Sequence, residues 1–110
     1  MKKFMAIYNT PAEVMAKAAS MTPEQQAEGM QAWFAWRDRC GDHLVDFGAP
    51  LIPGQTIQQD GSWSAAQAPI NGYSILQGES LEQVQVLFTG HPHLSYGEGC
   101  TVAVHEFAAM

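Results

Sequence analysis

Three short segments carry the reciprocal hydrogen-bonding pattern that starts an α-helix, and they divide the chain into alternating elements. Thr10-Pro11-Ala12-Glu13, Thr22-Pro23-Glu24-Gln25 and Ser80-Leu81-Glu82-Gln83 each place a hydroxyl at the N-cap and a Glu or Gln three residues later. In the first two segments a proline occupies the first helical position, where its missing N–H costs nothing. We therefore expect a helix to begin directly after each of the three hydroxyl residues.

The second of these helices is expected to run from Pro23 to about Cys40, with Gly41 following it in the left-handed conformation. Its apolar side chains recur at helical spacing and include several aromatic residues. A stripe this broad favours packing on the face of a sheet. The aromatic residues are therefore interpreted as core before any role in holding a cofactor is considered. The residues at this spacing are Met30, Trp33, Phe34 and Arg37, and Trp36 widens the stripe.

Apolar or alternating segments bounded by turn residues predict the strands, at residues 4–8, 44–48, 72–77 and 101–107. The first is apolar on both faces, which is typical of a central strand. A long polar segment from Leu51 to Ile70 precedes the third strand, and Asp60-Gly61 within it predicts a hairpin turn. A segment of this length forms either a hairpin or a mobile cover over a site.

The resulting order is strand, helix, strand, hairpin, strand, helix, strand, with a short helix added before the main one. This order predicts an α+β fold of the ferredoxin-like, split βαβ type with an antiparallel sheet. With 110 residues the chain has room for one hydrophobic core, so residues 1–110 are expected to form a single domain. Because the helices of such a fold cover only one face of the sheet, the other face must be buried, and a second copy is the usual partner.

The charge balance and the cysteines limit the partners and the compartment. A net charge of -6 with only five Lys and Arg residues leaves no basic patch for nucleic acid or for an anionic membrane surface. No transmembrane run is present, and the apolar start of the chain ends at Asn9 without a signal-peptide cleavage pattern. Cys40 and Cys100 lie in no disulfide or metal-binding framework, which favours a cytoplasmic protein and two small, buried apolar side chains.

Three segments, NGYSILQGESLEQVQVLFTGHPHL, CTVAVHEF and WFAWRDRCGDHLVDFGAPL, cover most of the chain outside residues 51–70. Together they resemble the YCII-related family of the dimeric α/β-barrel superfamily. The resemblance implies a homodimer in which two sheets face each other around a cavity. In the founding branch of the family, a histidine near the start of the main helix and an aspartate after the second helix form an apparent acid/base pair. These positions fall on about Gln25 and on His91, so the pair is not kept.

His91 and His93, on either side of a proline, are the first candidates for replacing that pair. Histidine has an ordinary pKa near neutrality, so either ring could act as an acid or base if other groups orient it. Equally, a histidine that follows a helix can bond the free carbonyls of the helix end. A metal site that adds His105, Glu98 and Asp46 is a weaker alternative, because two histidines at this spacing are not diagnostic.

Asp46 and Glu106 are the carboxylates assigned to the same site. Asp46 lies in an apolar strand, where an unpaired buried carboxylate would be costly, so we expect it to face the cavity or to pair with Arg37 or Arg39. Glu106 lines the cavity or lies at a wet edge, and His105 points to the opposite strand face. The expected catalytic residues are His91, His93 and Asp46, and the expected pocket residues are Glu106, Trp33, Tyr73 and Gln25.

These residues support two hypotheses of different kinds. The first is a YCII-like protein without a metal or other cofactor, which binds a small uncharged or cationic organic molecule in an apolar cavity near the dimer interface. It would act as a proton-transfer enzyme, an isomerase or lyase. The second is a non-catalytic binding or accessory module in which the histidines are structural. A cofactor-free or haem-linked oxygenase is a third possibility, which rests only on the chemistry of related barrels.

Overall fold

A four-stranded antiparallel sheet forms the body of the structure, and β1, Lys2–Asn9, is one of its two central strands. The computed structural model describes residues 1–66 and 70–109, and within it the strand order is β2-β5-β1-β6. All three pairings are antiparallel. This confirms the predicted α+β architecture and is consistent with its ferredoxin-like type. The other strands are β2, Leu44–Asp46, β5, Ile70–Gly78, and β6, Thr101–Glu106.

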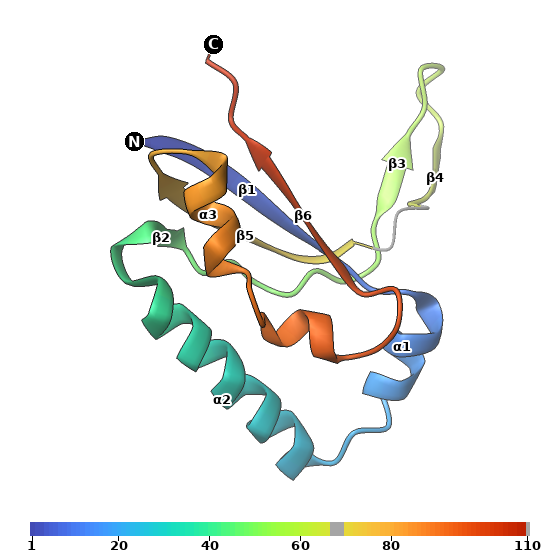
Figure 1. Ribbon diagram of the computed structural model, residues 1–110. Coiled ribbons are helices and arrows are strands. Elements are labelled where there is room, and N and C mark those ends of the chain that lie inside the picture. The colour runs from blue at the N-terminus through green and yellow to red at the C-terminus, as the bar shows by residue number, and fades with distance from the viewer. Residues whose placement is uncertain (67–69, 110) are drawn as a thin grey trace.

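Two helices pack on one face of this sheet (Figure 1). They are α2, Pro23–Cys40, which spans the predicted residues, and α3, Leu81–Leu87. The short additional helix predicted before α2 is also present, as α1, Ala12–Ala18. Alternate residues of β1 and β5 face these helices, as the two-residue period of a strand requires. The buried core between the layers consists of Phe4, Ala6, Tyr8, Trp36, Cys40, Leu76, Val84 and Phe88.

The opposite face of the sheet, here called the open face, also carries large apolar side chains. Met5 of β1 pairs with Ile75 of β5, and Ile7 pairs with Tyr73. All four side chains are only partly buried, whereas their neighbours on the helix-covered face are fully buried. The chain alone therefore leaves an apolar surface on the two central strands in partial contact with water.

The capping pattern correctly locates all three helices, but only α2 has both of the reciprocal capping hydrogen bonds that the pattern predicts. At α2, Thr22 Oγ1 accepts from the backbone N–H of Gln25, and the Gln25 side chain accepts from the backbone N–H of Thr22. At α3, Ser80 accepts from the N–H of Gln83, but the Gln83 side chain accepts from Glu79 instead. At α1 the prediction is wrong, because Pro11 is the N-cap and no side chain caps the helix.

Gly41 ends α2 with a positive φ of 54°, as predicted, although its ψ of -128° lies outside the left-handed helical region. Both cysteines are buried and unpaired with each other, which confirms their interpretation as small buried side chains. Burial raises the pKa of the Cys40 thiol to about 11, so this thiol is protonated at neutral pH. In the described part of the chain, no helix combines the length and the apolar character that crossing a bilayer requires.

The polar segment before β5 forms the predicted hairpin, with β3, Gln55–Ile57, paired to β4, Trp63–Ala65. Asp60 holds the turn by accepting from the backbone N–H and the hydroxyl of Ser62. Every residue of the two strands is exposed, and the hairpin projects away from the main sheet (Figure 1). The part of the predicted segment at residues 67–69 lies outside the described residues.

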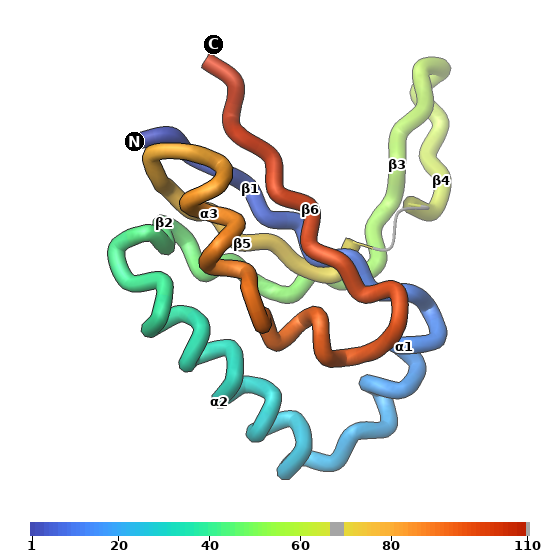
Figure 2. Tube along the Cα trace, in the orientation of Figure 1, coloured from blue at the N-terminus to red at the C-terminus, as the bar shows by residue number. Residues whose placement is uncertain are grey.

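Residues 88–100 connect α3 to β6, and this connection contains His91 and His93. This connection contains a 3-10 helix, η2, Pro92–Ser95, which contacts both α2 and β6. Figure 2 shows the connection running between these two elements. The two histidines thus lie on a segment that is covered on both sides.

Candidate functional site

His91 and His93 both point inward, and each side chain is only 1% exposed. The chain reaches this position through Gly90, whose positive φ of 70° turns it away from α3. Pro92 then takes the first position of η2, where a missing N–H is harmless. Neither imidazole therefore faces solvent.

His91 acts as the N-cap of η2. Its Nδ1 accepts a hydrogen bond of 3.0 Å from the backbone N–H of His93, so the proton of the neutral ring must be on Nε2. Nε2 is buried and has no hydrogen-bond partner among residues 1–66 and 70–109. The indoles of Trp33 and Trp36 stand nearly perpendicular to the imidazole, with ring centroids at 4.6 Å and 4.5 Å. The sequence is also compatible with a histidine side chain bonded to the last carbonyls of α3. The His91 side chain instead caps the start of η2.

This environment holds His91 in its neutral form. Burial among aromatic rings, together with the nearby His93 and Arg39, lowers the pKa of His91 to about 3. A ring with so low a pKa does not gain a proton near neutral pH. His91 therefore fits a positioning role better than the acid/base role predicted for it.

His93 is held in a different way. Its Nε2 lies 2.9 Å from the backbone carbonyl oxygen of Asn9. Because a carbonyl only accepts, Nε2 must donate, and Nδ1 is then the basic nitrogen of the neutral ring. The backbone N–H of His93 is bonded to His91, so both ends of the residue are fixed. The orienting group is a main-chain carbonyl, where the sequence predicted a carboxylate.

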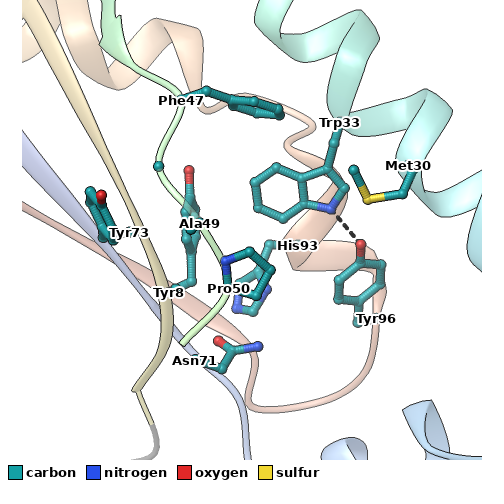
Figure 3. Close-up of a pocket in the computed structure, with 12 residues that line it drawn as sticks. Tyr8, Met30, Trp33, Phe47, Ala49, Pro50, Asn71, Tyr73, His93 and Tyr96 are labelled. Carbon is teal, nitrogen blue, oxygen red and sulfur yellow. Dashed lines mark hydrogen bonds between the residues drawn. The ribbon is translucent and has the colours of Figure 1, made fainter. Parts of the chain in front are cut away.

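His93 lies in the wall of a cavity of about 310 Å³, here called the aromatic cavity. Its lining comes from β1, α2, the loop after β2, β5 and η2, and it is mostly apolar. Figure 3 shows Trp33, His93 and Tyr96 converging on it from α2 and η2. A cavity of this size and character suits a small organic molecule. It is lined by Tyr8, Met30, Trp33, Phe47, Gly48, Ala49, Pro50, Asn71, Gly72, Tyr73, His93 and Tyr96.

Three hydrogen bonds fix the aromatic walls. The indole N–H of Trp33 donates to the hydroxyl oxygen of Tyr96, which links α2 to η2 (Figure 3). On the other side, Ser74 donates to the Phe47 carbonyl at 2.7 Å and accepts from the Tyr8 hydroxyl at 2.8 Å. Burial raises the pKa of Tyr8 far above its ordinary value, so the phenol stays protonated.

The structure does not bring Asp46 to the cavity. Its side chain is exposed and accepts from the backbone N–H of Gly48 at 2.8 Å, a local turn contact. The predicted pairing with Arg37 or Arg39 is wrong, because Arg37 pairs with Asp38 and Arg39 donates to backbone carbonyls. A three-residue β2 that ends at Asp46 places this carboxylate at the sheet edge, where water solvates it.

Among the predicted pocket residues, Trp33 and Tyr73 line the cavity, whereas Glu106 and Gln25 lie elsewhere. Glu106 lies at a wet edge, where it forms an ion pair of 3.4 Å with Lys2. Gln25 caps the exposed start of α2. Tyr73 borders the cavity, but its ring lies on the far side of β5 from Trp33, as its alternation with the buried Ser74 requires (Figure 3).

The weaker metal hypothesis receives no support from the arrangement of possible ligands. His105 pairs with Met5 and therefore lies on the open face, away from the histidine pair. Asp46 and Glu98 are both exposed. Within residues 1–66 and 70–109, no three His, Cys, Asp or Glu side chains lie close enough to share a metal ion.

Several cavity residues carried no recognised signal in the sequence. Tyr8 lies in the predicted first strand, and no motif in the sequence singles out Tyr96. Asn71 was missed although it precedes Gly72 within a strand, a pattern that suggests a bulge. The bulge is present, because Tyr8 pairs with Gly72 while Asn9 pairs with Ile70, which leaves Asn71 as the extra residue.

Comparison with known proteins supports the fold. Neither a protein-family model nor a curated protein matches the chain. A solved structure of 5-chloro-2-hydroxyhydroquinone dehydrochlorinase (TftG) from Burkholderia phenoliruptrix AC1100, in complex with 2,5-dihydroxybenzoquinone, matches with a TM-score of 0.51. The match covers 94% of this chain and 91% of that chain at 14% sequence identity. At this identity the likeness shows a similar fold, and the function must be argued from the site.

Proposed function

We propose that this chain binds a small, uncharged, largely apolar organic molecule in the aromatic cavity and that His93 exchanges a proton with it. The reaction class is isomerisation or elimination. The observation that carries this proposal is the placement of His93, whose imidazole lies in the cavity wall with Nε2 donating to the Asn9 carbonyl. This bond sets the tautomer and leaves Nδ1 to accept or return a proton.

The proposal assigns the two histidines different roles. His93 is the acid/base group, while His91 fixes the backbone of His93 through a hydrogen bond of 3.0 Å and stays neutral. The Asn9 carbonyl takes the orienting role first assigned to Asp46. The solved structure of similar fold was determined with a dihydroxylated six-membered ring compound. A ring of that size is compatible with a cavity of about 310 Å³.

The proton-transfer step can be tested with 5-nitrobenzisoxazole, a small apolar compound that reports on base catalysis. A base removes its C3 proton, the N–O bond breaks, and the coloured 2-cyano-4-nitrophenolate forms. We expect the wild-type protein to accelerate this elimination with saturation, and His93→Gln to lose about 100-fold of the rate, the usual contribution of a positioned base. The rate of phenolate formation is measured by visible absorbance.

His43→Gln is the matched control, because the His43 ring donates to the Gln77 carbonyl and lies outside the cavity wall. This variant should keep the wild-type rate. If His93→Gln is as fast as the wild type, the acid/base role of His93 is wrong. If the probe binds, seen as a change in tryptophan fluorescence, but the protein does not accelerate the elimination, the non-catalytic binding module is the better hypothesis.

We also propose that the chain is a YCII-related protein and pairs with a second copy through the open face. This is supported by the apolar residues Met5, Ile7 and Ile75, which the helices do not cover, and by the similar fold of the compared structure. Tyr73 borders the cavity and places its ring on this face, so the interface would lie close to the cavity.

Light scattering after gel filtration tests the pairing. We expect the wild-type protein at twice the chain mass of 12.0 kDa and Ile75→Asp at the single chain mass, because a carboxylate would be buried at the interface. Val86→Asp introduces the same charge on α3, where the side chain is 70% exposed, and should remain dimeric. A wild-type protein that is monomeric at high concentration contradicts the proposal.

A further inference from the structure

Two polar side-chain atoms next to the aromatic cavity are buried without a hydrogen-bond partner. Among residues 1–66 and 70–109, Thr10 Oγ1 and Asn71 Oδ1 have no protein group to bond, and Thr10 is only 3% exposed. Leaving a buried polar atom unpaired is energetically costly, so an atom without a protein partner is normally hydrogen-bonded to water or to a ligand. The Thr10 hydroxyl has no partner in the helix, because Pro11 and not Thr10 is the N-cap of α1.

Both residues lie at the same end of β1 as the bond that orients His93. Thr10 follows Asn9, whose carbonyl accepts from His93. Asn71 is the extra residue of the bulge opposite Asn9, and a bulge turns its side chain out of the regular alternation. Figure 3 shows the Asn71 carboxamide beside His93 and Pro50 at the lower end of the cavity.

A groove between α1, α2 and the end of η2 meets the aromatic cavity at this point. Thr10 and Asn71 both line the groove, and Asn71, Met30 and Tyr96 line the groove and the cavity together. Asn71 therefore lies where the two spaces join, and Thr10 lines the groove side of this junction. A ligand that occupies the aromatic cavity and extends to this junction comes next to both residues.

We infer that Thr10 and Asn71 form a subsite that recognises a neutral hydroxyl group of the ligand. As placed, Asn71 Oδ1 can only accept, whereas the Thr10 hydroxyl can donate. One ligand hydroxyl satisfies both, because it donates to Asn71 and accepts from Thr10. No Lys, Arg, Asp or Glu lines the aromatic cavity in the described part of the chain, and Lys17 lines only the adjoining groove, so a ligand seated in the cavity is expected to be an uncharged phenol or alcohol. This inference rests on the proposed function, since the ring of the ligand occupies the same cavity.

Hydroquinone and its dimethyl ether, 1,4-dimethoxybenzene, provide the test, because they share a ring and only the first can donate a hydrogen bond. Dissociation constants are measured by nuclear magnetic resonance titration, with oxygen excluded. We expect the wild-type protein to bind hydroquinone roughly 10-fold more tightly than the ether, the effect of one satisfied buried hydrogen bond. Thr10→Val and Asn71→Ala should each remove most of this preference while affinity for the ether is kept.

Ser95→Ala is the matched control, because Ser95 lines the same groove but already donates to the Pro92 carbonyl at 2.7 Å. It should keep the wild-type preference. Equal binding of both compounds to the wild type, or a preference that survives Thr10→Val, overturns the subsite and leaves the cavity proposal standing. Failure of both compounds to bind overturns the cavity proposal and the subsite with it. Thr10→Val conserves shape, so it and the wild type decide the question if Asn71→Ala does not fold.

Discussion

Lowering the pH from 7 to 4 is expected to cost the folded chain about 3 kcal/mol through His91 alone. The pKa of His91 is lowered to about 3 in the folded protein, mainly by burial, and it returns to its ordinary value near 6.5 on unfolding. Between these two values the unfolded chain binds a proton that the folded chain excludes. The contribution of neutral His91 to the free energy of unfolding is therefore fully present above pH 6.5. It is lost progressively as the pH falls towards 3.

The measurement is chemical denaturation of the wild type and of His91→Asn at pH 7 and at pH 4. Asparagine caps helices well and its side-chain oxygen can accept from the His93 N–H, but it does not titrate. The variant should be less stable at pH 7, because it fills less of the space between the aromatic rings. Its further loss on acidification should be about 3 kcal/mol smaller than that of the wild type.

Phe88→Leu serves as the control for the loss of packing. The Phe88 ring lies 5.4 Å from the His91 ring between centroids, and a leucine there removes contacts without removing a titrating group. This variant should lower the stability by a similar amount at both pH values. If the wild type and His91→Asn lose equal stability on acidification, His91 is not the buried neutral ring that the structure describes.

Gly48→Ala is expected to destabilise the fold on the order of 3 kcal/mol or to prevent its formation. Gly48 has a φ of 83°, and a Cβ atom at this position would lie 1.7 Å from the carbonyl oxygen of Tyr73. The obstacle is backbone of a central strand, which cannot move aside as a flexible side chain can. Thermal unfolding measured by circular dichroism should show a large decrease in Tm.

Gly61→Ala is the control that separates the cost of a positive φ from the cost of a steric clash with neighbouring backbone. Gly61 has nearly the same φ of 88°, but no atom lies within 4 Å of the position of its Cβ, since it is in the exposed hairpin turn. Its substitution should cost about 1 kcal/mol or less, and the effect should be confined to the hairpin. If the two variants unfold at the same temperature, the close approach of Gly48 to β5 does not constrain the fold.

The elements of the fold could be predicted because each depends on neighbours in the sequence. The helix α2 begins at Pro23 and ends at Cys40 as expected, since capping and helical periodicity act within one turn. The failure at Thr10 has a tertiary cause. This residue is buried at the end of β1, and the backbone conformation required there makes Pro11 the N-cap. A local pattern cannot detect that competition.

The candidate site was only partly predictable for the same reason. The His91-Pro92-His93 stretch could be selected as unusual, but its two rings were indistinguishable in the sequence. What separates them is contact with distant segments, since Trp33 and Trp36 of α2 surround His91 and the Asn9 carbonyl orients His93. Asp46 was misplaced because strand alternation does not reveal that β2 is a short edge strand.

The sequence by itself determined the antiparallel α+β architecture, its main helix and the burial of both cysteines, because hydrophobic periodicity, turn residues and capping are local properties. The tertiary structure decided which histidine is locked neutral and which faces the cavity, and it assembled the cavity from segments as distant as Tyr8 and Tyr96. The physical reason is that burial and hydrogen-bond partners set the protonation of a side chain, and both arise only when the helices close on the sheet.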